Sequence, residues 1–297
     1  MKTAFLVALV VLIFAGEAGS EAKIDNRSAE AGRGDAEAQF QLGLAYAEGT
    51  GVHRDDARAA KLFARAAAQN HLKAQHNLAL MYVEGRGVNR DEAKGLSWFK
   101  KAAKQNLAAS QDAVGMMILK GKGTKKDCRA AIGWFEKAAA QNFVDAQLHL
   151  GRLFYFGESE CVKDYTAAAK WLNKAAEAGN AWAANTLAVM YEDGQGVSQD
   201  KERAAALFRA AARKGDAKAQ ANLGRMYSTG ALGERDFVQA YAWLKLSADQ
   251  GEATGAVPLE EIRRGMTPIQ VEEGKRLAVK LRNEIASGAA KPNGGAQ

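Results

Sequence analysis

Proline is scarce in this 297-residue chain, and the three prolines lie at Pro258, Pro268 and Pro292. The first 257 residues therefore contain no residue that would break a helix by removing a backbone amide donor. Apolar residues make up 47% of the chain and charged residues 25%, a composition that excludes wholesale disorder. The scarcity of proline predicts an all-helical body.

Long apolar runs are also scarce, and the only one covers residues 4–15. Lys2 precedes this run and small residues follow it, a pattern typical of a secretory signal peptide over residues 1–22, cleaved after Ala18 or Ala22. Twelve apolar residues in a helix cover about 18 Å, which is short of the roughly 30 Å hydrocarbon core. We therefore expect a periplasmic or secreted protein without stable membrane insertion.

Most of the chain is organised by a repeat of 36 residues, which occurs six times and gains one residue in the fourth copy. In each copy a first helix with an apolar face ends at a glycine, and about six residues later an aspartate is placed to cap a second helix. The copies cover residues 35–70, 71–106, 107–142, 143–179, 180–215 and 216–251. The glycines are Gly49, Gly85, Gly121, Gly157, Gly194 and Gly230, and the aspartates are Asp55, Asp91, Asp127, Asp164, Asp200 and Asp236.

A large residue recurs in each second helix, one turn before a pair of small residues. This spacing predicts an inter-helix core position rather than a stacking platform for a ligand. The large residues are Leu62, Trp98, Trp134, Trp171, Leu207 and Trp243.

The pattern Ala-x-x-x-Leu-Gly-x-x-Tyr-x-x-Gly-x-Gly-Val-x-x-Asp, seen at residues 38–55 and, with Ala188 in place of the first glycine, at 183–200, resembles that of the Sel1-like repeat proteins. The resemblance covers about three quarters of the chain and implies a right-handed α-solenoid that acts through protein interaction rather than catalysis. Outside the repeats we expect an N-terminal stub, capping helices and a disordered tail. These segments are residues 23–34, 252–286 and 287–297. Within the second segment we expect a closing helix from Pro268 to about Ile285, with Leu277, Leu281 and Ile285 facing inward. Thr267 and Gln270 are placed to form a capping box at its start.

Two cysteines in an exported protein are most simply a disulfide pair, and we predict a bridge between Cys128 and Cys161. The inserted residue of the fourth repeat would let its loop lean towards the third. No histidine falls in a metal-binding motif, so neither a metal site nor a cofactor is expected. Ser97 and Lys100 match Ser-x-x-Lys of penicillin-interacting serine enzymes, but the accompanying Ser-Asp-Asn and Lys-Thr-Gly motifs are absent.

First helices commonly line the concave groove of such arrays, so their outward positions are candidate partner contacts. The third and fourth repeats combine cations with apolar residues there, a combination enriched at interfaces. Ordinary scatter on a solvated face explains this combination equally well. The candidate groove residues are Asn77, Leu80, Met116, Lys120, His149, Arg152, Phe156 and Arg225.

The net charge of +7 suits an acidic partner and does not by itself indicate nucleic acid. We therefore expect a non-catalytic adaptor or regulator of the bacterial cell envelope that binds an acidic or amphipathic segment of a protein partner. The alternatives are a cell-wall or β-lactam-acting enzyme that uses Ser97 and Lys100, and a eukaryotic endoplasmic-reticulum adaptor, for which Asn26 begins a single glycosylation sequon.

Overall fold

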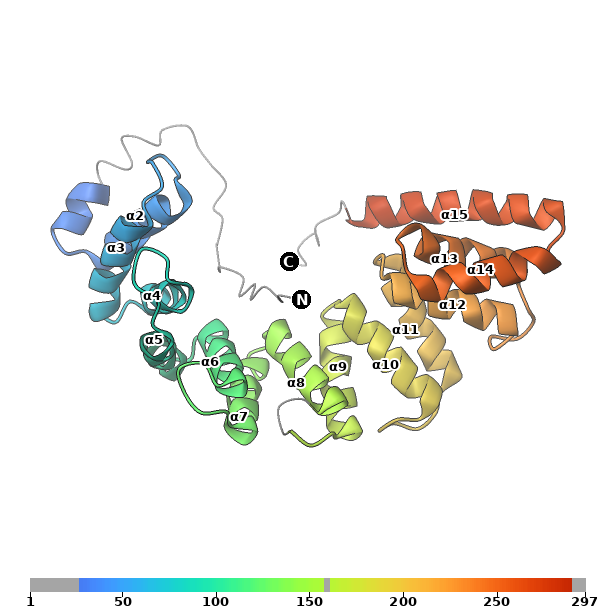
Figure 1. The fold of residues 1–297 in the computed structure, drawn as a ribbon, viewed down its shortest axis with the longest axis horizontal. Coiled ribbons are helices and arrows are strands. Elements are labelled where there is room, and N and C mark those ends of the chain that lie inside the picture. The colour runs from blue at the N-terminus through green and yellow to red at the C-terminus, as the bar shows by residue number, and fades with distance from the viewer. Residues whose placement is uncertain (1–26, 158–160, 290–297) are drawn as a thin grey trace, which may run out of the picture. The chain divides into compact units, whose positions relative to one another are not determined.

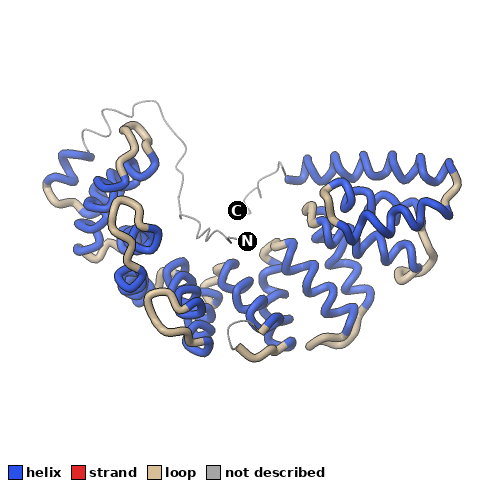
Figure 2. The backbone as a smooth tube through the Cα atoms, viewed as in Figure 1, coloured by secondary structure: helices blue, strands red, loops and turns tan. Residues whose placement is uncertain are grey.

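The computed structural model describes residues 27–157 and 161–289, and all regular structure within these ranges is helical (Figures 1 and 2). The predicted signal peptide and the glycosylation candidate Asn26 lie outside the described residues. None of the described helices is long and apolar enough to cross a membrane. The all-helical prediction is therefore confirmed over the described residues.

The described residues form two compact units. The first contains residues 27–146 together with Cys161, and the second contains residues 147–157 and 162–289. In the first unit a helical segment at 27–32 precedes three helix pairs: α2 (Ala36–Glu48) with α3 (Asp56–Ala68), α4 (Leu72–Glu84) with α5 (Glu92–Lys104), and α6 (Ala108–Lys120) with α7 (Cys128–Ala139).

The second unit begins at Gln147, within α8 (Val144–Phe156). It contains the pair of α8 with α9 (Tyr165–Glu177) and two further helix pairs. These are α10 (Ala181–Asp193) with α11 (Lys201–Arg213), and α12 (Ala217–Thr229) with α13 (Phe237–Asp249). Two more helices follow, α14 (Ala253–Gly265) and α15 (Pro268–Ala289). Six helix-turn-helix repeats followed by a C-terminal helix are therefore confirmed.

The ends of the helices lie where the sequence predicts them. Each loop aspartate accepts a hydrogen bond from the backbone amide three residues later, at 2.9 Å in all six repeats. Each glycine after a first helix has a left-handed φ between 68° and 76°, a conformation that is costly for residues with a Cβ atom. Local hydrogen bonding at these caps explains why all six loops enter the second helix in the same way.

The predicted ladder of bulky residues is wrong by one position in most repeats. Trp98 and Trp134 are only half-buried, although Trp171 and Trp243 are buried. Consecutive helix positions differ by about 100°, so only one of two adjacent large residues can face the first helix. The residue after the predicted one fills the core in every repeat. The core residues are Phe63, Phe99, Phe135, Leu172, Phe208 and Leu244.

A buried glutamine of the first helix joins adjacent repeats, a feature that the sequence reading missed. Gln75 donates through Nε2 to the carbonyl oxygen of Ala67, at the end of the preceding repeat, at 3.3 Å. Its Oε1 accepts from Gln105 at the end of its own repeat, at 2.9 Å. The same arrangement recurs in three other repeats. The equivalent pairs are Gln39 with Gln69, Gln111 with Gln141, and Gln220 with Gln250.

The C-terminal helices cover the end of the second unit. Thr267 and Gln270 form the predicted capping box at the start of α15, where each side chain accepts from the other residue's backbone amide. Leu281 is buried, and Leu277 and Ile285 pack against the same core, as predicted. The helix continues to Ala289, so residues 287–289 are helical rather than part of a disordered tail.

Candidate partner-binding site

Two of the predicted groove residues in the first unit do not face solvent. Asn77 is 4% exposed and Leu80 is 2% exposed. The first helix of the next repeat, α6, lies against this side of α4. His76 of α4 and Ser110 of α6 are in contact there, with Nδ1 of the histidine 2.8 Å from the serine hydroxyl. The prediction that Asn77 and Leu80 face outward is therefore wrong, because the neighbouring repeat covers them.

The remaining candidates in the first unit are more accessible. Lys120 is exposed at the end of α6 and Met116 is half-buried one turn earlier. Neither of them lines the cleft of about 260 Å³ between α4, α5 and α6, which is lined by Leu80, Phe99 and Met117 among others. Its apolar floor is almost closed to solvent, because each of these three side chains is at most 2% exposed.

The second unit holds the most distinctive surface. Phe156, at the end of α8, is 46% exposed, and its ring centroid lies 6.5 Å from that of the half-buried Trp182 on α10. The exposed guanidinium of Arg152 lies 5.4 Å from the centroid of the same indole ring. His149, the fourth candidate of this region, is half-buried one turn before Arg152. The structure therefore brings Arg152 and Phe156 together around Trp182.

Two tyrosines extend this group of rings. Tyr155 packs edge-on against Phe156 at 4.9 Å and against Tyr165 of α9 at 5.6 Å between centroids. Burial raises the pKa of Tyr155, and the neighbouring Tyr165 and Asp193 raise it further. Its hydroxyl therefore stays protonated at neutral pH and can donate a hydrogen bond. We call Arg152, Tyr155, Phe156, Tyr165 and Trp182 the aromatic cluster.

Members of the aromatic cluster occupy positions where the other repeats carry different residue types. The other five repeats carry only polar or charged residues at the position of Phe156. None of the other five has an aromatic residue at the position of Trp182. The equivalents of Phe156 are Glu48, Glu84, Lys120, Asp193 and Thr229, and those of Trp182 are Glu37, Lys73, Ala109, Asp145 and Lys218. Aligning equivalent positions across repeats, rather than reading one helix face, was the signal that could have found Trp182.

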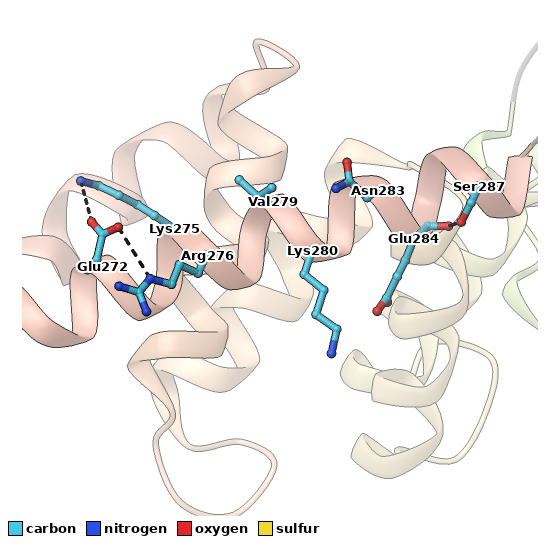
Figure 3. A pocket seen from close by; sticks show the side chains of 8 residues that line it. All are labelled: Glu272, Lys275, Arg276, Val279, Lys280, Asn283, Glu284 and Ser287. Atoms are coloured by element: carbon cyan, nitrogen blue, oxygen red, sulfur yellow. Dashed lines mark hydrogen bonds and ion pairs between the residues drawn. The ribbon is translucent and has the colours of Figure 1, made fainter.

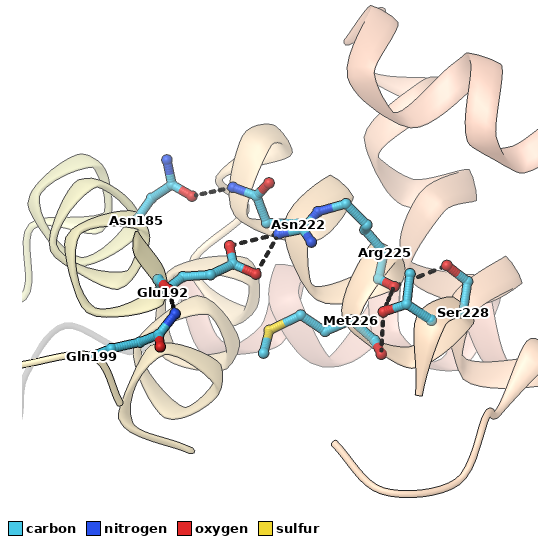
Figure 4. A network of polar contacts seen from close by, with 8 residues as sticks. Asn185, Glu192, Gln199, Asn222, Arg225, Met226 and Ser228 are labelled. Carbon is cyan, nitrogen blue, oxygen red and sulfur yellow. Dashed lines mark hydrogen bonds and ion pairs between the residues drawn. The ribbon is translucent and has the colours of Figure 1, made fainter. Parts of the chain in front are cut away.

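Arg225, the last predicted groove residue, is held by a neighbouring repeat (Figure 4). Its terminal nitrogen donates to both carboxylate oxygens of Glu192, at 2.8 and 2.6 Å. Asn222 donates to Asn185 at 3.1 Å beside this pair, and Gln199 donates to the backbone oxygen of Glu192. Arg225 therefore links α12 to α10, and its charge is already neutralised within the unit.

Cys128 and Cys161 form a disulfide, with their Cα atoms 5.6 Å apart. In other repeats, the second of the two glycines in the loop packs on the start of the second helix of the preceding repeat. A Cβ atom on Gly123, for example, would lie 2.5 Å from the carbonyl oxygen of Glu92. Cys128 occupies the position equivalent to Glu92, and the loop of the fourth repeat lacks that glycine. The disulfide therefore joins the loop of one repeat to the start of the previous second helix, the same two elements that close backbone packing joins elsewhere.

The residues proposed for the enzymatic alternative form no organised site. Ser97 is exposed and Lys100 half-buried on α5, and within the described residues neither side chain takes part in a hydrogen bond or ion pair. No group of three or more histidine, cysteine or acidic residues within residues 27–157 and 161–289 could hold a metal ion.

The outer face of α15 borders a cavity of about 810 Å³ (Figure 3). All eight described side chains that line it come from this one helix, and Glu272 pairs there with Lys275 and Arg276 at 3.6 and 3.9 Å. Because no second element contributes a described side chain, this face is a helix surface rather than a built site.

Comparisons with known proteins agree with this architecture. The chain is similar to the crystal structure of c5321, a protective antigen present in uropathogenic Escherichia coli strains displaying an SLR fold, with a TM-score of 0.54 and 29% identity. That match covers 89% of this chain but 64% of the other, so the chain spans less than two thirds of that protein's length. A Sel1 repeat protein from Oxalobacter formigenes matches with a TM-score of 0.60 and 26% identity, over 78% of this chain and 97% of the other.

The comparison with curated proteins gives no match. The model of the Sel1 repeat matches six segments, which together cover most of the chain and follow the helix pairs described above. They are residues 36–71, 72–107, 108–143, 144–180, 183–216 and 217–252. This chain therefore belongs to the Sel1 repeat family.

Proposed function

We propose that the protein is a non-catalytic adaptor of the bacterial cell envelope, which binds a segment of a partner protein through the aromatic cluster. The observation that carries the proposal is the convergence of Arg152, Phe156 and Trp182 on one surface. Phe156 and Trp182 depart from the residue types that the other repeats carry at these positions. Arginine and large aromatic residues supply most of the binding energy at protein interfaces.

The chemistry of the aromatic cluster indicates the kind of segment that would bind. The exposed ring of Phe156 beside Trp182 offers apolar area for an aliphatic or aromatic side chain. Arg152 is positioned over the indole ring, and its planar donors suit a carboxylate. A segment with an apolar residue and an acidic residue close together satisfies both, which agrees with the acidic or amphipathic partner expected from the sequence.

The envelope location rests on the N-terminal signal-peptide pattern, Lys2 followed by the apolar run of residues 4–15. Mass spectrometry of the protein recovered from the periplasm tests this part separately. An N-terminus at Gly19 or Lys23 is the expected result, and an intact N-terminus in the cytoplasm would contradict it.

A photo-crosslinking amino acid at position 156 tests the binding surface in cells. We expect a defined protein adduct from position 156 and none from position 229, an exposed position equivalent to 156 in the sixth repeat. Arg152→Glu, in a chain that carries the crosslinker at 156, should reduce the adduct at least tenfold, because charge reversal removes the site for a carboxylate. Equal adducts from positions 156 and 229, or an adduct unaffected by Arg152→Glu, would show that the partner does not bind at the aromatic cluster.

A further inference from the structure

Charge is unevenly divided in the first unit. The loops and second helices of repeats one to three, residues 49–70, 85–106 and 121–142, contain 15 Lys and Arg and six Asp and Glu, a net charge of +9. The first-helix halves of the same repeats have a net charge of −3. The loops and second helices of repeats four to six together carry only +1. The positive charge of the protein is thus concentrated on the loops and second helices of one unit.

These second helices expose the same side in each repeat. α3, α5 and α7 bury equivalent residues, including Phe63, Phe99 and Phe135, so their opposite sides face outward together. Arg65 and Lys101 are exposed at one equivalent position, and Lys137 continues the series. Within the described residues none of the three has a carboxylate within ion-pair distance. Three unneutralised cations therefore recur at repeat spacing, about 10 Å apart.

Two of these cations lie against half-buried tryptophan rings. The ammonium group of Lys101 lies 3.8 Å from the ring centroid of Trp98, and that of Lys137 lies 4.4 Å from the centroid of Trp134. Each indole is half-buried, so part of it lies in the interior and part is accessible to solvent, an environment that suits an amphipathic ring. The second-helix face thus combines long cationic side chains with amphipathic aromatic rings.

We propose that this face, the exposed sides of α3, α5 and α7 around Arg65, Lys101 and Lys137, binds the surface of an anionic phospholipid bilayer. Cations near such a surface each contribute to attraction by the lipid phosphates, and indole rings favour the headgroup region. The aromatic cluster lies in the other unit, on α8, α9 and α10, so the two surfaces share no residue.

The spacing of the charges favours a bilayer over an acidic protein. The cations are distributed along three helices at repeat spacing rather than converging on a single point where one carboxylate would be held. A fluid layer of headgroups can match any spacing, whereas a folded partner would need acidic groups in the same register.

Co-sedimentation with vesicles tests this proposal on the protein purified after export. We expect binding to mixed phosphatidylglycerol–phosphatidylcholine vesicles, weak binding to pure phosphatidylcholine vesicles, and loss of binding as salt is raised. The triple variant Arg65→Glu, Lys101→Glu, Lys137→Glu should bind the anionic vesicles about 100-fold more weakly. If the predicted signal peptide is retained, it contributes equally to vesicle binding by the parent and by each variant.

A matched variant changes the same charge elsewhere. Lys275→Glu, Arg276→Glu, Lys280→Glu alters three exposed cations of α15 and should leave vesicle binding within about twofold of the parent. Circular dichroism confirms that both variants remain folded. Equal loss in the two variants would mean that only total charge matters, and binding to polyglutamate without binding to vesicles would identify an acidic protein as the occupant. Either result overturns the proposal.

Discussion

A buried histidine lies between the second and third repeats. His76 is 3% exposed, its Nδ1 lies 2.8 Å from the Ser110 hydroxyl, and its ring packs edge-on against Phe99. Burial lowers the pKa of His76 from 6.5 to about 4, because the surroundings disfavour the charged imidazolium. The side chain is therefore neutral in the folded protein at any pH above about 4.

This shift makes stability depend on pH. The unfolded chain protonates His76 near pH 6.5 while the folded protein does not, so the free energy of unfolding falls as pH decreases from about 6.5 towards 4. Between pH 7 and pH 5 we expect His76 to account for about 2 kcal/mol of this loss. Urea denaturation of His76→Gln should show a pH dependence weaker by that amount. His53→Gln, at an exposed histidine, should keep the parent slope, and an unchanged slope in His76→Gln would contradict the prediction.

At the scale of elements, the loop within each repeat fits closely against the previous repeat. Gly87 has a φ of 66°, and a Cβ atom there would lie closer than 3.0 Å to the backbone carbonyl of Asp56. The second glycine of the loop is therefore needed both for its left-handed conformation and for close backbone approach. Gly133, inside α7, has no such role, because a Cβ atom added there would meet no other atom within 4 Å.

Two alanine substitutions should consequently have opposite effects. Gly87→Ala should reduce the free energy of unfolding by about 2 kcal/mol or more, because a backbone clash is added to a strained φ. Gly133→Ala should increase it by about 0.5–1 kcal/mol, because alanine loses less entropy in a helix. Thermal and urea unfolding of the two variants side by side measure both signs. A stabilised Gly87→Ala protein would show that the loop does not pack on Asp56 as described.

At the scale of the whole molecule, the disulfide restricts the unfolded chain. Cys128 and Cys161 are 33 residues apart, and closing a loop of that length lowers the entropy of the unfolded state by an amount worth about 3–4 kcal/mol at 25 °C. The double variant Cys128→Ser, Cys161→Ser should lose stability by about this amount under oxidising conditions. Adding a reductant should destabilise the parent protein but leave the variant unchanged. If both respond alike, the bridge does not contribute as proposed.

The sequence predicted the arrangement of helices better than the exposure of individual side chains. Caps such as Asp91 and terminators such as Gly85 act through local hydrogen bonds and φ angles, so their positions alone define the helix ends. Trp98 and Phe99 are both large and adjacent, and the 36-residue period cannot distinguish which of them faces the core. Leu80 was misplaced because its burial depends on the next repeat, which a single helix pattern does not contain.

The candidate site was only partly predictable for a related reason. Arg152 and Phe156 lie on the helix face that the sequence indicated, whereas Trp182 comes from the start of the following first helix. Its approach depends on how far successive first helices are offset, a quantity set by tertiary packing and not by spacing along the chain.

The buried glutamines have a consequence for how such a protein can change in length. Gln75 donates to the end of the preceding repeat and accepts from the end of its own repeat, and three other repeats share this arrangement. Across a junction, such a repeat therefore needs only a backbone carbonyl at the end of its neighbour. Duplication or deletion of one of these four repeats therefore preserves the glutamine pairings, while an insertion of any other length inside a helix would leave buried amides without partners. Evolution can accordingly adjust the number of binding surfaces in steps of one repeat without redesigning the junctions.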